Sequence, residues 1–334
     1  MDREPSNGPS PSARDRAGGE VANVAYVGGS PGFESASEVL NGFATVQHVT
    51  AEPGAVAAAL SIADALLDAS MKVRITDQMI AASPRLRVIS CATTGSDHID
   101  RRVIEERGIA VHTLREDPEI LRDITPAAEL SWALLLACAR RLPAAVAHVR
   151  AGGWVREEFP GIMLNGRTLG LVGCGRIGGW MARYARAFGM NVIGYDPELK
   201  TFPDTIERAA LEDVFEQADF VSLHVHLTPQ TESMISAELL ARARSGLVLI
   251  NTSRGQILDE AALLEGLLSG RIAAAGLDVL TGEPDIANHP LVEYSRSHDN
   301  LLITPHCGGF SPDAVRFVCA HAARKIKTAL SNRE

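Results

Sequence analysis

From Val21 onward the chain alternates short apolar runs with longer amphipathic stretches, and the rhythm is clearest in its second half. Strands that are apolar nearly throughout, separated by helical patterns, are typical of a parallel sheet covered by helices on both faces. The pattern therefore predicts a doubly wound α/β domain. Its predicted strands are TLGLV (168–172), NVIGY (191–195), DFVSLHV (219–225), LVLIN (247–251), AAGLDVL (274–280) and NLLIT (300–304).

The first half repeats this alternation on a smaller scale and predicts a second parallel α/β unit ending near residue 120. The sequence thus predicts two Rossmann-like or flavodoxin-like domains, each a doubly wound parallel sheet. In the first unit, strands are expected at 21–28, 71–76, 86–93 and 109–114, and helices at 55–68 and 101–108.

A long helix is expected to follow the first unit, over about residues 125–142. Thr125 suits its N-cap, and Pro126 suits the first helical position, where a missing N–H costs nothing. From Ala128 to Leu142 the stretch is apolar around most of its circumference, so we expect it to be buried at a domain or subunit interface. The last helix is expected to begin in the same way, with Ser311 as its cap.

Composition narrows the class of protein. A chain of 334 residues, with 46% hydrophobic and 22% charged residues, is long enough for two globular domains. The net charge of −9 and the lack of a basic block argue against binding to nucleic acid or to a membrane surface. No apolar run approaches the roughly 20 residues that span a bilayer. We therefore expect neither a nucleic-acid nor a membrane partner.

The N-terminal stretch and the cysteines favour a cytoplasmic protein. Residues 1–20 are rich in Pro, Ser, Gly and charge, which predicts a disordered tail and not a signal peptide. The five cysteines have neither CxxC pairing nor the spacing of a secreted disulfide scaffold, so we expect reduced thiols. They are Cys91, Cys138, Cys174, Cys307 and Cys319.

A glycine motif follows the first strand of the second half. GLVGCGRIGGW places Gly173, Gly175 and Gly178 between a strand and a helix, in the order that lets a backbone turn tightly and approach a pyrophosphate. The next strand ends in Asp196, 18 residues beyond Gly178. A carboxylate there accepts both ribose hydroxyls and repels a 2′-phosphate, which favours NAD(H) over NADP(H). The alternative for Asp196 is a turn former before Pro197.

Three further strands deliver polar side chains just past their carboxyl ends. LVLINTSRG places Arg254 there, AGLDVLTGEP places Asp278 and Glu283, and LLITPH places His306. Ligands of an open parallel sheet bind beyond the carboxyl ends of its strands, so we expect these side chains to meet at one edge, near the nicotinamide. Taken singly, the arginine, the glutamate and the histidine also suit a surface ion pair, a turn and a helix-entry cap.

Together these side chains suit hydride transfer to a 2-keto acid. A histidine titrates in the range needed to protonate the forming alkoxide. A carboxylate on its other ring nitrogen fixes the tautomer and favours the imidazolium. An arginine can bind a substrate carboxylate with both arms of its fork and polarise the adjoining carbonyl.

These motifs resemble those of the D-2-hydroxyacid dehydrogenase family, which includes D-3-phosphoglycerate, glyoxylate/hydroxypyruvate and D-lactate dehydrogenases. The resemblance runs from about Val21 to the C-terminus. It implies an NAD-dependent oxidoreductase of D-2-hydroxy or 2-keto acids, with its active site in a cleft between two domains. The motifs that carry it are TTGSDHID, GLVGCGRIGGWMARYARAFGMNVIGYDP, VSLHVHLTPQT, INTSRGQILDE, GLDVLTGEP and TPHCGG.

The resemblance also implies roles for individual residues. Arg254 would bind the substrate's carboxylate and carbonyl, His306 would be the acid/base, and Glu283 would be its carboxylate partner. The backbone amides of Thr94 and Gly95 would bind the substrate carboxylate, and Asp278 would hold the nicotinamide carboxamide. No metal is implied, and the cofactor-binding set is Gly173, Gly175, Arg176, Ile177, Gly178, Asp196, His224, Thr228, Thr252, Asp278 and His306.

By the same likeness the substrate-binding domain is discontinuous, formed by residues 21–122 and 305–334. The NAD-binding domain would span residues 123–304 and include the long helix. A homodimer built through that helix is implied as well.

Two positions depart from the family's pattern. His226 stands where the family has proline, and Cys307 where it has an aliphatic residue. His224 and His226 share one face of a strand, but no third ligand with suitable spacing is apparent, so no metal site is expected. Cys174 and Cys307 are expected to be small fillers and not redox switches, although they could make the enzyme sensitive to thiol reagents.

The segment HTLREDPEILRDITP (112–126) is longer than the family's usual turn. Arg115 and Arg122 within it are candidates for binding a second anionic group on the substrate, such as a phosphate, phosphonate or carboxylate. The alternative is that both are solvated or paired with acids of the same segment. Those acids are Glu116, Asp117, Glu119 and Asp123.

Two other functions are compatible with this fold. An NAD(H)-sensing protein like the corepressors of the family can retain Arg254, Glu283 and His306 and yet show little turnover. A phosphite-type dehydrogenase is a weaker alternative. The family's formate enzymes pair their histidine with glutamine, so Glu283 argues against that activity.

Overall fold

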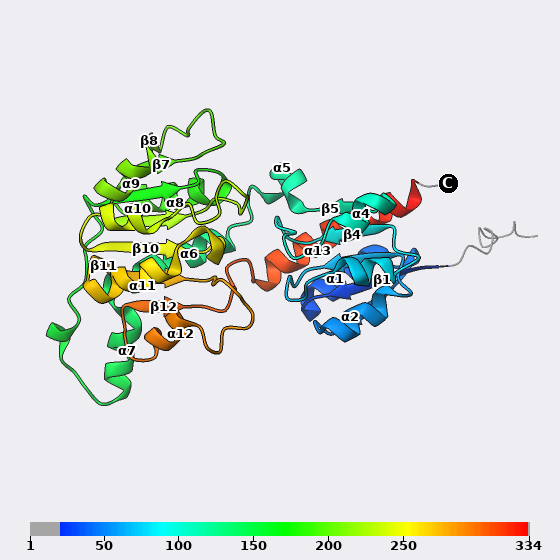
Figure 1. Ribbon diagram of the computed structural model, residues 1–334, viewed down its shortest axis with the longest axis horizontal. Helices are drawn as coiled ribbons and strands as arrows, with labels where there is room; N and C mark the ends of the chain where they lie inside the picture. Colours follow the sequence, from blue (N-terminus) through cyan, green and yellow to red (C-terminus); the bar gives the residue numbers. More distant parts are fainter. Residues whose placement is uncertain (1–20, 333–334) are drawn as a thin grey trace, which may run out of the picture. The chain divides into compact units, whose positions relative to one another are not determined.

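The computed structural model describes residues 21–332, which fall into two compact units (Figure 1). Unit 1 contains residues 21–92, 96–113 and 319–332, and unit 2 contains residues 93–95 and 114–318. The predicted N-terminal tail lies outside the described residues. Both units are parallel sheets with helices on their faces, which confirms the predicted fold class.

Unit 1 has the strand order β2-β1-β3-β4-β5, which is the flavodoxin-like arrangement. Its apolar core lies between the sheet and helices α2, α3 and α4. The strands are β1 (Ala22–Val27), β2 (Ala44–Val49), β3 (Ala65–Asp68), β4 (Val88–Cys91) and β5 (Ala110–His112). The helices are α1 (Ser30–Leu40), α2 (Pro53–Leu60), α3 (Asp77–Ala81), α4 (Arg102–Arg107) and the end of α13 (Pro312–Ser331).

Two predicted elements of unit 1 were wrong, and α1, β2 and α3 were not predicted. The helix expected over 55–68 ends at Leu60, and its last four residues form β3, a central strand that is buried throughout. A short apolar run fits a buried strand and a buried helix equally well, so periodicity could not separate them. The strand expected at 71–76 is also absent, because only Ile75 makes a bridge, to Ile99.

Unit 2 has the strand order β12-β11-β10-β9-β6-β7-β8, all parallel, so the order reverses between β6 and β9. All six predicted strands are present, and the two-residue β8 is added at the edge. The strands are β6 (Thr168–Val172), β7 (Asn191–Tyr195), β8 (Glu207–Arg208), β9 (Phe220–Leu223), β10 (Leu247–Asn251), β11 (Ile272–Leu277) and β12 (Leu301–Ile303).

Two apolar clusters cover the two faces of this sheet. One lies under α6 and α8, and the other under α9, α10, α11 and α12. The longer helices are α6 (Pro126–Arg140), α7 (Leu142–Arg150), α8 (Arg176–Ala187) and α11 (Glu260–Ser269). The shorter helices are α5 (Pro118–Leu121), α9 (Leu211–Gln217), α10 (Ala237–Arg242) and α12 (Pro290–Ser295).

The long predicted helix is α6, and its apolar surface is buried inside unit 2. Leu135 and Ala128 are fully buried, and the helix packs on β10, β11 and α8. Thr125 stands at the N-cap, but its hydroxyl bonds to the carboxylate of Glu129, 2.5 Å away, and caps no backbone amide. The cap predicted for the last helix is present, since the amide of Ala314 donates to Ser311 Oγ.

Within residues 21–332, no single helix has both the length and the apolar character needed to cross a membrane. Helices α6 and α7 meet that description only as a pair, which is bent by 64°.

Candidate active site

The glycine motif lies where the strand order of unit 2 reverses. Gly173 has a positive φ of 96°, and a Cβ there would lie 2.6 Å from the carbonyl carbon of His224 on the neighbouring strand end. A Cβ on Gly178 would lie 2.1 Å from the carbonyl oxygen of Gly173, so this glycine lets α8 approach β6. A Cβ on Gly175 would meet nothing within 4 Å. The loop is therefore packed against the protein at Gly173 and Gly178 and has free space at Gly175. A pyrophosphate would fit into this space, at the start of α8.

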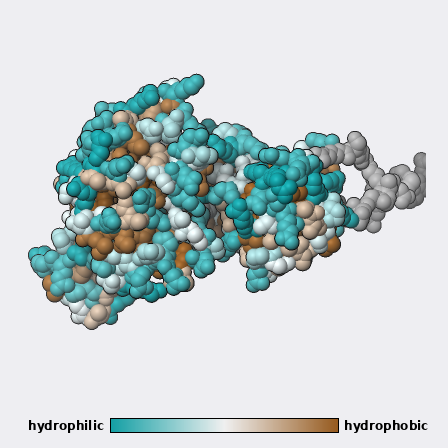
Figure 2. Space-filling model, viewed as in Figure 1, coloured by the Kyte–Doolittle hydropathy of each residue, from teal (hydrophilic) through white to brown (hydrophobic). Residues whose placement is uncertain are grey.

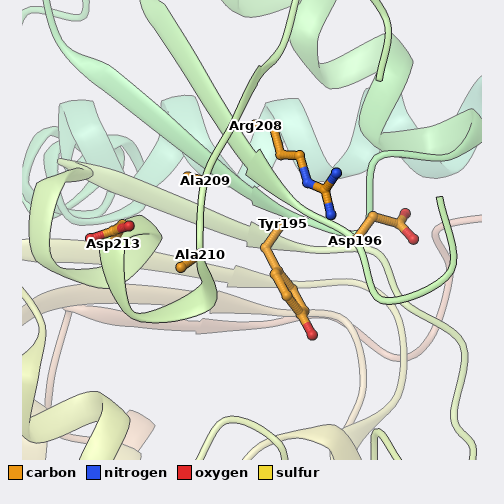
Figure 3. Close-up of a pocket in the computed structure, with 6 residues that line it drawn as sticks. All are labelled: Tyr195, Asp196, Arg208, Ala209, Ala210 and Asp213. Carbon is orange, nitrogen blue, oxygen red and sulfur yellow. The ribbon is translucent and has the colours of Figure 1, made fainter. Parts of the chain in front are cut away.

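Asp196 directly follows β7 and joins the glycine loop to the end of that strand. Its Oδ2 accepts a hydrogen bond from the amide of Cys174 at 2.8 Å, and its Oδ1 accepts two more, from the amides of Glu198 and Leu199. The residue is thus also the turn former that the sequence offered as the alternative. A cavity of about 400 Å³ opens beside it (Figure 3), lined by Tyr195, Asp196, Arg208, Ala209, Ala210 and Asp213. These groups fit the adenosine half of a dinucleotide.

His306 and Glu283 form a close pair on the edge of the sheet formed by β11 and β12. His306 Nδ1 lies 2.6 Å from Glu283 Oε1, and both side chains are about one-third exposed. The amide of Leu280 points at the other carboxylate oxygen of Glu283, 3.4 Å away. The sequence therefore placed these two residues correctly with respect to each other.

A left-handed backbone presents the imidazole. His306 has φ +50°, a conformation that costs a non-glycine residue on the order of 1–2 kcal/mol. Its amide donates to the carbonyl oxygens of Asp278 and Thr304, at 2.9 and 3.0 Å, which holds this conformation.

Asp278 is the buried anchor of the loop that carries His306. It is 1% exposed, and its carboxylate accepts hydrogen bonds from Thr304 Oγ1 at 2.5 Å, Cys307 N at 2.9 Å and Gly308 N at 2.7 Å. A Cβ on Gly308 would lie 2.9 Å from that carboxylate, so the contact requires glycine. The predicted bond from Asp278 to the nicotinamide stays a prediction. Sequence reasoning missed the bonds that Asp278 makes to the loop after β12.

Arg254 follows β10 in a tightly fastened loop. The buried Asn251 donates to the Arg254 carbonyl oxygen at 2.9 Å, and its own side-chain oxygen accepts from both the amide and the hydroxyl of Ser253. The Arg254 guanidinium donates to the Ser253 carbonyl oxygen at 2.8 Å. The next residue, Gly255, packs on the backbone of the loop that carries Glu283, where a Cβ would lie 2.2 Å from Thr281 N.

The segment 114–125 is fastened to the start of α8. The Arg176 guanidinium donates to the carbonyl oxygen of Ile124, and the indole of Trp180 donates to that of Arg122. Burial lowers the pKa of Arg176. Arg115 pairs at 3.7 Å with Glu198, a residue just past β7 and outside its own segment.

The two histidines after β9 differ in their surroundings. His224 lies beside Gly173 and Gly178, and burial lowers the pKa of its imidazole to about 3, so the ring stays neutral. Burial also lowers the pKa of His226, and the nearby guanidinium of Arg115 adds to this effect. Among the described residues, no group of three or more His, Cys, Asp or Glu could hold a metal ion.

Burial raises the pKa of both cysteines beside the motifs, to about 12 for Cys174. For Cys307, the carboxylate of Asp278 adds to that rise. Both thiols therefore stay protonated, which disfavours attack by thiol reagents.

The remaining residues predicted to bind substrate or cofactor lie at four further positions in unit 2. Thr94 and Gly95 lie in the bend after β4, and Ile177 lies in the first turn of α8. The Thr252 hydroxyl contacts that of Ser131 on α6, at 2.6 Å. Thr228 contacts the buried Thr231, whose hydroxyl donates to the His226 carbonyl oxygen.

Comparison with known proteins bears on what this arrangement does. Residues 132–308 match the family model "D-isomer specific 2-hydroxyacid dehydrogenase, NAD binding domain", and residues 32–119 match the corresponding "catalytic domain". A hydroxypyruvate reductase of Thermotoga maritima is 38% identical over 76% of this chain and 80% of its own length.

A D-3-phosphoglycerate dehydrogenase of Methanocaldococcus jannaschii is 39% identical over 77% of this chain. The chain spans only about half the length of that relative, 48%. A D-lactate dehydrogenase of Aquifex aeolicus, solved with NAD and lactic acid, superposes with a TM-score of 0.78. It is 26% identical, over 92% of this chain and 96% of its own.

The glycine packing yields a prediction about cofactor binding. In Gly178→Ala, the added methyl group would displace the Gly173 carbonyl and open the loop, so we expect NADH to bind at least about tenfold more weakly, roughly 1.4 kcal/mol. Quenching of protein fluorescence by NADH measures the dissociation constant. Gly179→Ala, on the same helix with nothing within 4 Å, is the control and should bind NADH as the wild type does. Equal affinity in all three proteins would contradict the assignment of this loop.

Proposed function

The chain belongs to the D-isomer specific 2-hydroxyacid dehydrogenase family, and we propose that it interconverts a small 2-keto acid and its D-2-hydroxy acid with NAD(H). The observation that carries this proposal is the contact of 2.6 Å between His306 and Glu283, on the sheet edge that also bears Arg254. A histidine oriented by a carboxylate is the proton donor that reduction of a keto group needs.

In the proposed reaction each residue has one task. Bound NAD(H) supplies or accepts the hydride. Glu283 accepts a hydrogen bond from the Nδ1–H of His306, which leaves Nε2 to exchange a proton with the substrate oxygen. Arg254 binds the substrate carboxylate and polarises its carbonyl, and the backbone amides of Thr94 and Gly95 bind the same carboxylate.

The proposed cofactor site extends from the glycine loop to Asp196. Gly175 would leave room for the pyrophosphate, and the Asp196 carboxylate, beside the cavity that follows β7, would bind the ribose. We assign residues 123–304 to the NAD-binding domain, and residues 21–122 with 305–334 to the substrate-binding domain.

We also propose a substrate that carries a second anionic group. Three guanidinium groups, of Arg115, Arg176 and Arg254, are close enough to His226 to disfavour its protonated form. This local excess of positive charge, moderated by Glu198, suits a phosphate, phosphonate or distal carboxylate.

The resemblance implies a homodimer built through the long helix, but the apolar surface of that helix, α6, is buried inside unit 2. We therefore propose that the homodimer forms through α7 and the stretch that follows it. Trp154 is 87% exposed and Met163 is 72% exposed. Apolar side chains gathered in this way mark protein interfaces. Figure 2 shows brown and tan atoms at the lower left, where Figure 1 draws α7. The whole set, here called the α7 patch, is Leu142, Val146, Val149, Trp154, Val155 and Met163.

The cytoplasm is the proposed location. All five cysteines are free thiols, which a reducing compartment maintains.

Reduction of 2-keto acids by NADH tests the proposed activity. We expect at least one of glyoxylate, hydroxypyruvate, pyruvate, 3-phosphohydroxypyruvate, phosphonopyruvate and branched-chain keto acids to be turned over, as followed by loss of NADH absorbance. His306→Ala should lower kcat by about 10²–10⁴-fold and leave NADH affinity unchanged, because only the proton donor is removed. His298→Ala, whose ring stacks on Tyr294, is the control. Tight NADH binding without turnover of any acid would favour the NADH-sensing alternative.

The proposed second anionic group of the substrate is tested separately, with substitutions of Arg115 and Arg122. Arg115→Ala should raise KM roughly tenfold or more for substrates with a second anionic group, since a charge-assisted hydrogen bond contributes about 1.5–3 kcal/mol. KM for glyoxylate and pyruvate should stay the same. Arg122→Ala is the matched comparison, and an effect there alone would move the role to that arginine. Equal changes in KM for all substrates would reject this pocket.

Dimer formation is tested on the α7 patch. Val149→Asp places a charge in the proposed interface, so the wild type should sediment as a dimer and the variant as a monomer. Leu268→Asp, on α11 and 64% exposed outside the patch, should leave the dimer intact. A monomeric wild type at micromolar concentration would refute the proposal.

A further inference from the structure

The turn Leu280–Thr281 lies between two carboxylates. On one side, the Leu280 amide points at Glu283 Oε2, 3.4 Å away, and the Glu283 amide points back at the Leu280 carbonyl oxygen, 3.5 Å away. On the other side, the Thr281 amide donates to Glu260 Oε1 at 2.9 Å. The position of this short turn therefore fixes where the carboxylate of Glu283 lies.

Glu260 is well placed to hold the turn. It is the first residue of α11, whose cap Asp259 accepts the amide of Ala262, and a helix N-terminus favours a carboxylate there. Its side chain is only 13% exposed, so each of its oxygens needs a donor. Thr281 supplies one donor, and His289 supplies the other.

The tautomer of His289 follows from its two contacts. Its Nδ1 accepts the amide of Leu291 at 3.2 Å, as the cap of α12, so Nδ1 carries no proton. The proton therefore lies on Nε2, which donates to Glu260 Oε2 at 3.1 Å. The pair is a neutral imidazole and a carboxylate, and it ties the far end of the loop that carries Glu283 to α11.

We propose that Glu260 and His289 are positioning residues for the His306–Glu283 pair. Glu260, supported by His289, binds the Thr281 amide of the Leu280–Thr281 turn, and Gly255 packs against the same turn. The turn then positions Glu283 beside Nδ1 of His306. Neither residue needs to touch the substrate. This inference rests on the function proposed above, in which that pair moves the proton.

A double-mutant cycle tests whether Glu260 acts through Glu283. We expect Glu260→Ala to lower kcat about tenfold with KM for NADH unchanged, and to have less than a twofold effect in a Glu283→Gln background. Glu265→Gln, on the exposed face of the same helix, is the control and should match the wild type. A tenfold loss in both backgrounds, or a change confined to KM, would overturn the proposal.

If Glu260→Ala does not fold, the milder variant Glu260→Gln can be tested in its place. Glu260→Gln can still accept from Thr281, but its amide group faces the Nε2–H of His289, donor against donor. We expect about a threefold loss of kcat, again absent in the Glu283→Gln background. The same loss in both backgrounds would count against the proposal.

Hydrogen exchange separates this inference from the proposed function, because it needs no substrate. Amides of residues 278–286 should exchange faster in Glu260→Ala or Glu260→Gln than in the wild type and in Glu265→Gln. Unchanged exchange would overturn the positioning role even in an active enzyme. If the wild type reduces none of the acids but the Glu260 variants still exchange faster, the positioning role is supported and only the proposed substrate class is contradicted.

Discussion

The buried carboxylate of Asp278 is the interaction on which the site depends. Asp278 directly follows β11, and it accepts hydrogen bonds from a hydroxyl and two amides of the loop that follows β12, so one side chain joins two adjacent strand ends. Without it, these three donors would lose their partner, at a cost of about 1–3 kcal/mol for the buried amide of Gly308 and less for the two part-buried groups. The loop would also be held less firmly around His306, whose left-handed conformation is stabilised by the bonds of its amide to the carbonyl oxygens of Asp278 and Thr304.

The same edge shows how precise positioning is obtained from loops. Arg254, Glu283 and His306 follow three neighbouring strands, and each following loop is tied to the next. Gly255 packs on the Leu280–Thr281 backbone, and Glu283 contacts His306. These buried contacts restrict the motion of loops that would otherwise be flexible. The proposed proton-transfer pair requires such precise positioning.

Much of unit 2 could be predicted because its strands are short apolar runs in a regular alternation with helices. The topology then brings residues past adjacent strands to one edge, so the meeting of Glu283 and His306 followed from sequence. Unit 1 was harder. Its strand β3 has the same pattern as a buried helix, and its edge strand β2 alternates only weakly. The contacts of Asp278 with Thr304, of Glu260 with Thr281 and of Arg115 with Glu198 each join residues 20 or more apart in the chain, and no local pattern marks them.

The firmly held residues at the sheet edge and the residues of the exposed segments differ in how freely they can vary, which bears on substrate specificity. His306 and Glu283, to which we assign the proton transfer, contact each other, and their loops are tied to buried groups of the sheet, so exchanging them would disturb this edge. Arg115 and His226, by contrast, lie in exposed segments near the first turn of α8 and past β9. Charge can vary at these two positions without loosening the loop that carries His306. In the function proposed above, residues that select among 2-keto acids can therefore vary at positions of this kind while the assigned proton-transfer pair stays the same.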